Sequence, residues 1–281
     1  QLLLEREGRR LLFSGDVGRP NEPLMKAPEP PREADFIVVE STYGDRTHQR
    51  SDPENAFRAA IRRTFDRGGS VIIPAFALGR TQEVLYHLSQ LVDDGELDPN
   101  DVFLDSPMGI EATEVYARFR HLYDTKLFGD GSDAPKLPNL HQTRTPEESM
   151  VINEVEAGAI VIAGSGMCSG GRILHHLKHN VWRPQCHLVI VGFQAYGTLG
   201  RRLVDGAETI KLWGQDYRVQ IQIHTIGGLS AHADQQDLVE WYGGFRSRPP
   251  VYLVHGEESA QRVLANTLRD AFGAPVTIPE Y

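Results

Sequence analysis

The chain has 281 residues, of which 40% are hydrophobic and 24% charged, and this composition is typical of a globular protein with one large domain or two ordinary ones. It contains no apolar run near the ~18–20 residues that a membrane span requires, and its two cysteines are too few for a disulfide framework and fit a reducing cytoplasm. The net charge of −9 argues against a broad basic surface that binds nucleic acid. It does not exclude a local nucleic-acid-binding groove or a cluster of carboxylates that binds metal ions.

The predicted elements begin with a hairpin, because two apolar stretches flank the polar turn at residues 5–10. Mostly buried strands are predicted at residues 36–40, 70–76, 101–107, 158–166, 186–193 and 251–257, and a half-exposed strand at 219–225. Helical patterns occur at residues 80–92, 109–121, 171–179, 233–241 and 258–271. This alternation of strands and helices predicts an α/β architecture.

Four side chains with metal-binding or acid–base chemistry follow strand-like runs: Asp16, Glu40, His232 and His255. Reactive groups of α/β folds gather beyond strand ends, and carboxylates and imidazoles are the ligands that divalent ions such as Zn²⁺ accept. Each residue also has a simpler interpretation. Asp16 and Glu40 can open turns, His232 can belong to a helix cap, and His255 can be a structural histidine. Their occurrence together favours a functional site.

Seven motifs in this order carry a resemblance to a known family: SGDVGR, VVESTYGDR, PAFALGRTQE, AGSGMCSGGR, GFQAYGTLGRR, LSAHAD and VHGE. The chain resembles the metallo-β-lactamase/β-CASP nucleases, and most closely the bacterial relatives of the cleavage and polyadenylation factor endonuclease. The resemblance implies a partial metallo-β-lactamase αββα sandwich with an inserted β-CASP α/β domain. The sandwich would take residues 1–44 and 226–281, and the β-CASP domain residues 45–225, with the active cleft between the two.

The resemblance also implies a role for each of the four side chains. Asp16 matches the carboxylate that bridges two zinc ions, and His255 matches the last histidine ligand. Glu40 matches the acid that ends the strand leading into the inserted domain. His232 matches a histidine that is hydrogen-bonded to this acid and protonates the leaving oxygen.

The glycine-rich loop GSGMCSGGR, residues 164–172, follows a predicted strand and opens a predicted helix, so its N–H groups can bind an anion, although a bare tight turn remains an alternative. By resemblance it lines the RNA cleft, with Ser165, Gly166 and Arg172 as phosphate contacts. Arg80 either faces the cleft or pairs with a carboxylate. His175 and His176 are expected on the helix surface, and three residues of the GFQAYGT motif either stack bases or pack in the core: Phe193, Gln194 and Tyr196.

One departure from the family pattern limits these expectations, because the motif His-x-His-x-Asp-His and a later histidine ligand do not occur in the 281 residues. Asp16 and His255 alone cannot hold a dinuclear zinc centre, since each zinc needs about three protein ligands. Either the chain is a fragment, which its start at Gln1 within a hairpin favours, or its metal site is degenerate. The fragment itself is expected to be inactive.

For the intact protein the predicted function is zinc-dependent hydrolysis of single-stranded RNA, more as an endonuclease than as an exonuclease, with two Zn²⁺ ions, in the cytoplasm and away from membranes. The sequence leaves open whether the protein forms a homodimer. The first alternative is a non-catalytic RNA-binding β-CASP scaffold subunit, and the second is an enzyme of the same family that acts on DNA. The retention of Glu40 and His232 beside the two ligands argues against the scaffold, which has no chemical need for them.

Overall fold

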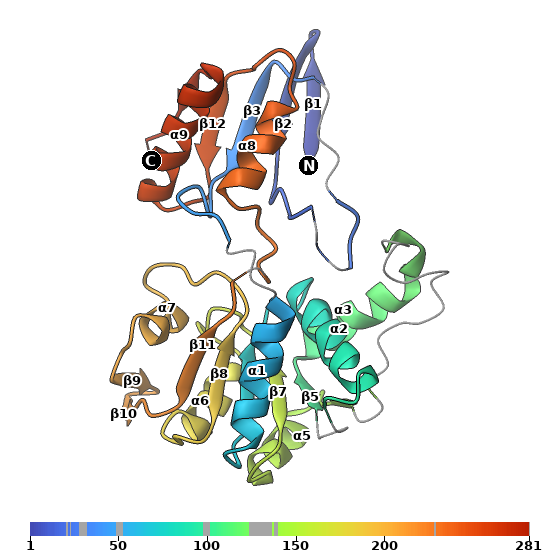
Figure 1. Cartoon of the computed structure of the whole chain (residues 1–281), viewed down its shortest axis with the longest axis vertical. Coiled ribbons are helices and arrows are strands. Elements are labelled where there is room, and N and C mark those ends of the chain that lie inside the picture. Colours follow the sequence, from blue (N-terminus) through green and yellow to red (C-terminus); the bar gives the residue numbers. More distant parts are fainter. Residues whose placement is uncertain are drawn as a thin grey trace. The chain divides into compact units, whose positions relative to one another are not determined.

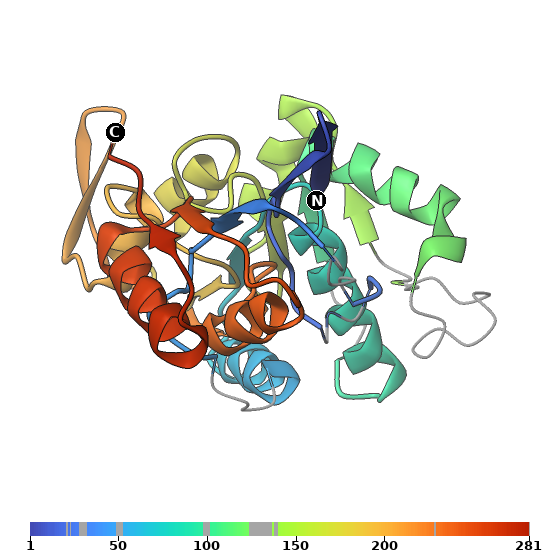
Figure 2. The same ribbon diagram turned by 90° about the horizontal axis from the view of Figure 1, so that it is seen from above.

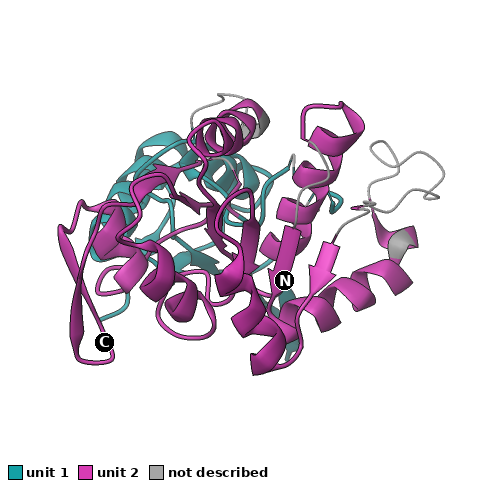
Figure 3. Cartoon of the chain, turned by 90° about the horizontal axis from the view of Figure 1, so that it is seen from below, with its two compact units in different colours: residues 1–49, 231–281 teal, residues 50–230 magenta. Residues whose placement is uncertain are grey.

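The computed structural model describes residues 1–20, 22, 24–27, 33–48, 53–97, 102–123, 137, 140–227 and 229–280. The chain divides into two compact units. Unit 1 comprises Gln1–Gln49 and Ala231–Tyr281, and unit 2 comprises Arg50–Ser230 (Figure 3). The boundaries expected from the sequence, after residues 44 and 225, each lie five residues before those of the structure, after residues 49 and 230.

The sheet of unit 1 has the strand order β1-β2-β3-β12-β13 (Figure 1). Its strands are β1 (Leu2–Arg6), β2 (Arg9–Phe13), β3 (Phe36–Glu40), β12 (Val251–Val254) and β13 (Val276–Thr277). β1 and β2 form the predicted antiparallel hairpin, and Glu7 and Gly8 close it with φ angles of 53° and 74°, as a two-residue turn requires. The remaining neighbours are parallel, so β2, β3 and β12 end at the same edge.

The core of unit 1 lies on one face of this sheet. Two helices, α8 (Gln235–Gly243) and α9 (Glu258–Phe272), cover that face (Figure 2). Leu12, Ile37 and Leu253 belong to the cluster that packs between the sheet and these helices. Because side chains alternate along a strand, their neighbours point to the other face. A registered apolar row crosses that face and is only partly buried: Leu2, Phe13, Val38 and Tyr252.

The sheet of unit 2 is parallel throughout, with the order β11-β8-β4-β7-β5-β6. Its strands are β4 (Val71–Pro74), β5 (Val102–Asp105), β6 (Leu140–Gln142), β7 (Ile160–Ala163), β8 (His187–Ile190) and β11 (Gln222–Thr225). The four central strands are buried along their whole length, as their continuous apolar runs predict for a sheet covered on both faces.

Two hydrophobic clusters cover the two faces of the unit 2 sheet. Val71 and Ile73 join one cluster and Ile72 joins the other, because alternate residues of β4 point in opposite directions. The first cluster takes side chains from α1 (Pro53–Phe65), α2 (Arg80–Asp93) and α3 (Pro107–Arg118). The second takes them from α6 (Ile173–Asn180), α7 (Leu199–Val204) and a hairpin of β9 (Thr209–Leu212) and β10 (Gln215–Arg218).

The α/β architecture predicted from the sequence is confirmed. The sequence analysis missed α1, the short helix α5 (Pro146–Val151), α7, the β9–β10 hairpin and the short strands β6 and β13. Apart from α1, these elements have six residues or fewer, so their periodicity is too short to be recognised. Among the described helices, none combines the length and the apolar character that a membrane crossing needs.

Candidate active site

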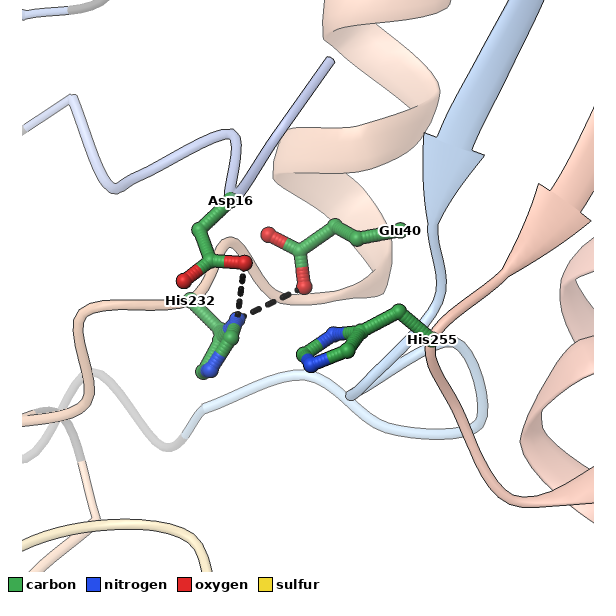
Figure 4. A group of neighbouring side chains, drawn as sticks. All are labelled: Asp16, Glu40, His232 and His255. Atoms are coloured by element: carbon green, nitrogen blue, oxygen red, sulfur yellow. Dashed lines mark hydrogen bonds and ion pairs between the residues drawn. The ribbon is translucent and has the colours of Figure 1, made fainter. Parts of the chain in front are cut away.

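Asp16, Glu40, His232 and His255 lie together in unit 1, and each offers a ligand atom within 4.8 Å of those of the others (Figure 4). Asp16 follows β2, Glu40 is the last residue of β3, and His255 comes directly after β12. These three strands are parallel neighbours, so their carboxyl ends deliver the side chains to one edge of the sheet. His232 joins them from the segment before α8.

Glu40 is buried and held from three sides. Its Oε1 accepts a hydrogen bond from the Val17 N–H at 2.7 Å, and its own N–H donates to Ser14 Oγ at 3.1 Å. Its Oε2 lies 2.8 Å from Nδ1 of His232 (Figure 4). A carboxylate at this distance keeps a proton on Nδ1 and fixes the orientation of the ring, so that Nε2 is the nitrogen left for a substrate.

Thr42 is a site residue that the sequence analysis did not single out. Its Oγ1 lies 3.3 Å from Nδ1 of His232 and 3.2 Å from Nδ1 of His255, and it also contacts the His255 carbonyl oxygen at 3.2 Å. The hydroxyl therefore connects the two histidines. Its position two residues after Glu40, within the motif VVESTYGDR, was the signal available in the sequence.

The backbone after β12 is shaped to present His255. This residue has a φ of 51°, a conformation that is uncommon for residues other than glycine. Gly256 follows it so closely against Ser41 that an added Cβ would lie 2.5 Å from the Ser41 carbonyl oxygen. A glycine is therefore needed here for the chain to pass the end of β3, and a non-glycine backbone in this conformation is typical of functional sites.

The donor types at the site fit a divalent metal ion, although their number is small. Asp16 has a side chain 61% exposed, with Oδ1 3.9 Å from Nδ1 of His232, and it accepts no closer bond from the described residues. In His255 the contact of Nδ1 with Thr42 leaves Nε2 as the metal-binding nitrogen. Glu40 is already committed to Val17 and His232. Among the described residues of this cluster, Asp16 and His255 thus keep a donor atom that could bind a metal ion, fewer than the three or so that zinc requires.

The glycine-rich loop of unit 2 is compact and internally bonded. Ser165 Oγ accepts the N–H of Ser169 at 3.1 Å, and Gly166 lies so close to the Phe76 ring that an added Cβ would meet it at 2.6 Å. Gly171 has a φ of 76°, and a Cβ there would lie 2.5 Å from the Gly164 carbonyl oxygen. The phosphate contacts expected of Ser165 and Gly166 stay predictions.

Arg172, the third residue expected to contact phosphate, points into unit 2. Its Nη1 lies 2.5 Å from Asp105 Oδ1 and donates to the Thr143 carbonyl oxygen at 2.9 Å, and its Nη2 donates to the Arg144 carbonyl oxygen at 2.7 Å. Contact with a phosphate would compete with these bonds, so the structure assigns the guanidinium a part in holding the loop. The phosphate contact stays a prediction.

Asp105 is fully buried at the end of β5 and gathers several partners. Its Oδ2 accepts from Ser149 Oγ at 2.7 Å and lies 2.7 Å from Nε2 of His176, and Thr143 also donates to it. Burial by itself raises the pKa of Asp105, but the hydrogen bonds from His176, Thr143 and Ser149 outweigh it and hold the pKa well below its ordinary value. The expectation that His176 lies on the helix surface is wrong, because Asp105 draws it into the core, whereas His175 is exposed as expected.

Of three further residues singled out in the sequence, two are buried and bonded within unit 2 and one is exposed. Arg80 is buried and forms an ion pair with Glu83, one turn further along α2, which is the carboxylate pairing that the sequence left open. Gln194 is buried and its Nε2 donates to the Gly166 carbonyl oxygen at 2.8 Å, so it supports the glycine-rich loop. Tyr196 is exposed.

Two family models match the chain. The model described as the Beta-Casp domain matches residues 81–203, and the model described as the Zn-dependent metallo-hydrolase RNA specificity domain matches residues 216–279. The first match lies within unit 2, and the second begins in unit 2 and continues through the C-terminal segment of unit 1.

Three curated relatives show the extent of the similarity. The chain is 36% identical to "Ribonuclease TTHA0252" of Thermus thermophilus over 93% of its own length and 61% of that protein. It is 33% identical to "Transcription termination factor FttA" of Pyrococcus abyssi over 86% of its length and 39% of that protein. It is 29% identical to an "RNase J-like protein" of Methanocaldococcus jannaschii over 99% of its length and 65% of that protein. The chain thus spans less than two thirds of these relatives.

Proposed function

Because the chain belongs to the metallo-β-lactamase/β-CASP family, with the α/β fold that its motifs indicated, we propose that the intact protein is a metal-dependent ribonuclease. The observation that supports this most is the grouping of Asp16, Glu40, His232 and His255 within 4.8 Å at one edge of the unit 1 sheet. The grouping joins two available ligands to a separate carboxylate–imidazole pair, which is the division of labour that metal-assisted hydrolysis needs.

Asp16 and His255 would hold the metal, for which zinc is the proposed ion and two the proposed number. The family model that covers residues 216–279 is described as Zn-dependent, and the carboxylate and imidazole donors suit zinc. Further ligands would have to come from beyond the described residues of this cluster, because two ligands do not complete even one zinc site. When bound, such ions supply a hydroxide near neutral pH and neutralise charge on the phosphate.

Glu40 and His232 supply the acid–base chemistry in this proposal. Glu40 accepts a hydrogen bond from Nδ1–H of His232, so the imidazole can give a proton from Nε2 to the oxygen that leaves the phosphorus. Thr42 holds both imidazoles through their Nδ1 atoms, which fixes the distance between the proton donor and the metal ligand. Single-stranded RNA, cleaved internally, is the proposed substrate. The description of an RNA specificity domain and the ribonuclease names of two relatives support the choice of RNA.

The two thiols fit the proposed location in a reducing cytoplasm. Cys168 and Cys186 are free and buried, and burial raises the pKa of Cys168 to about 12, so this thiol is unreactive. They therefore need no oxidising compartment.

The test compares two substitutions at the pair in the intact protein. Glu40→Gln removes the charge that holds the His232 proton, and His232→Ala removes the proton donor, so each should lower the rate of RNA cleavage about 10²- to 10⁴-fold. The affinity for RNA, measured by fluorescence anisotropy, should stay unchanged. Glu7→Gln is the matched control, because Glu7 is exposed in the turn between β1 and β2, at the end of β2 opposite to Asp16.

Two results would contradict the proposal. If Glu40→Gln cleaves RNA as fast as the parent protein, the pair has no catalytic part. If the intact parent protein binds RNA and does not cleave it with zinc present, the non-catalytic scaffold becomes the better account.

A further inference from the structure

Trp213 occupies a position that the backbone disfavours for a large side chain. The two-residue turn between β9 and β10 consists of Trp213 and Gly214, with φ angles of 47° and 83°. Turns with two positive φ angles favour Asn-Gly or Gly-Gly, and a bulky residue in the first position is an outlier. Burial of the indole does not offset this strain, because Trp213 is 57% exposed. An exposed side chain in a strained conformation points to a function.

The indole is held in place by α6. The ring centroids of Trp213 and His175 are 4.7 Å apart with an angle of 34° between the planes, and Nζ of Lys178 lies 6.0 Å from the indole centroid. Contacts of this kind fix the orientation of an aromatic ring and place a cation beside it. The hairpin therefore presents an oriented and partly open indole next to a positive charge.

The face of α6 that contacts Trp213 carries further basic and aromatic side chains. His175, Lys178 and His179 are spaced three and four residues apart on one helical face, and Trp182 follows at the same period, 52% exposed. Burial and then the positive charges of Lys178, His176 and His175 lower the pKa of His179. On the hairpin, Lys211 stands opposite Asp216, so these two charges balance. Lys178 thus places a positive charge among aromatic and imidazole rings on a chain whose net charge is −9.

We propose that Trp213, with His175 and Lys178, is a base-stacking subsite for single-stranded RNA, separate from the metal site. A base stacks on the open part of the indole, and Lys178 faces the adjoining phosphate. Interleaved aromatic and cationic groups are the pattern that binds single strands, whereas a protein partner is typically met by a continuous apolar patch. This subsite rests on the proposed function in so far as RNA is the ligand.

The subsite joins Trp213, which neither family model covers, to two residues of α6 that the first model covers. Trp213 lies among residues 204–215, which fall between the ranges that the two family models match. α6, which carries His175 and Lys178, begins at Ile173, directly after the glycine-rich loop of residues 164–172. A strand that passes this loop meets the indole at the first turn of α6, because Trp213 stacks on His175, three residues after Arg172.

The test separates stacking from charge by using two probes. One is a fluorescein-labelled single-stranded oligoribonucleotide, and the other is the same sugar–phosphate strand without bases. Both are titrated into the intact protein that carries Glu40→Gln, because this substitution should slow cleavage enough for the first probe to stay intact. Trp213→Asn should fold well, because asparagine suits the turn, and thermal melting checks this.

Trp213→Asn should weaken binding of the base-containing strand about tenfold and leave binding of the abasic strand unchanged. Lys178→Gln should reduce the slope of log affinity against log salt by about 1 for both strands. Phe119→Ala is the matched control, because Phe119 is an exposed aromatic residue of unit 2 that contacts a histidine, His121, at a centroid distance of 6.0 Å. It should change neither affinity.

The outcomes distinguish this proposal from the ribonuclease proposal. Equal affinity of the Trp213→Asn and parent proteins for the base-containing strand overturns the subsite, even if the intact protein cleaves RNA. A loss confined to the base-containing strand supports the subsite, even if no cleavage is found. Loss of binding to a co-purifying protein, with unchanged affinity for RNA, also overturns it.

Discussion

Each unit contains a buried carboxylate bonded to an imidazole, and the two pairs differ in what surrounds them. In unit 1, Glu40 lies 2.8 Å from His232, whose side chain is 18% exposed and borders the exposed Asp16. In unit 2, Asp105 lies 2.7 Å from His176, whose side chain is 2% exposed. Asp105 is also bonded to Arg172, Thr143 and Ser149. The same contact therefore leaves the imidazole of His232 accessible for chemistry, whereas that of His176 is sealed in the core.

The two sheets differ in a corresponding way. The unit 2 sheet has a hydrophobic cluster on each face, whereas the unit 1 sheet has its cluster on one face and the partly exposed Leu2–Phe13–Val38–Tyr252 row on the other. Parallel sheets are normally covered on both faces, as the unit 2 sheet is. The unit 1 sheet, which carries the candidate site at its edge, has a hydrophobic cluster on one face only among the described residues.

The largest expected effect on stability comes from Asp105→Ala. This change leaves Arg172 and His176 partly or fully buried without their common anion, and removing one partner of a buried ion pair costs about 3–5 kcal/mol. Glu40→Ala should cost clearly less, because His232 has access to water. Urea unfolding of the intact protein measures both. Equal losses would remove the distinction between the two pairs.

The pH dependence of the Asp105→Ala deficit gives an independent check. The native environment holds the pKa of Asp105 below its ordinary value of 3.8, so the carboxylate contributes stability at pH above 3.8. This contribution is lost as the pH falls through the lowered native value. The difference in unfolding free energy between the parent and Asp105→Ala should thus be constant from pH 7 to pH 5 and shrink below about pH 4.

A smaller effect concerns acid sensitivity within unit 2. His187 on β8 stacks on His224 of β11 at 4.7 Å, and both of its ring nitrogens are buried without a hydrogen-bond partner among the described residues. Burial first, and then the charges of His224, Arg67 and Arg63, lower the pKa of His187 to about 4. Protonation thus favours the unfolded chain, and stability should fall as the pH drops from about 6.5 to about 4, by up to about 3 kcal/mol.

Hydrogen exchange can locate this loss. Amides of β8 and β11 should exchange faster at pH 5 than the change in intrinsic rate explains, and those of β3 and β12 should not. His187→Phe should abolish the difference, and His121→Phe, at an exposed histidine, should preserve it. Acid sensitivity that is the same in both units would contradict the assignment to His187.

The smallest expected effect separates two threonines in matched positions. Thr42→Val removes the hydroxyl that contacts both imidazoles of unit 1, and it should lower the rate of RNA cleavage about tenfold with little loss of stability. Thr143→Val removes a hydroxyl that donates to Asp105 in unit 2, and it should lower the unfolding free energy by about 1–3 kcal/mol with the rate unchanged. Kinetics with saturating RNA and urea unfolding measure the two effects. A rate loss in Thr143→Val would show that unit 2 takes part in the chemistry.

The sequence by itself determined the α/β class and the four side chains of the candidate site. Asp16, Glu40 and His255 could be named because each follows an apolar run, and parallel neighbouring strands bring their ends to one edge. His232 was named in the same way, although the structure places it in the segment between β11 and α8, and the ordered motifs added the family. These are local signals, and local patterns are what a single sequence displays.

Only the tertiary structure decided which polar side chains already have hydrogen-bond or ion-pair partners within the protein. Arg172 and Asp105 are 67 residues apart and His176 and Asp105 are 71 apart, so no spacing in the sequence indicated that these side chains would meet. The connecting position of Thr42 and the exposure of Trp213 were hidden for the same reason. Whether a histidine or an arginine serves a ligand or the core depends on partners from distant strands, and packing alone brings these partners together.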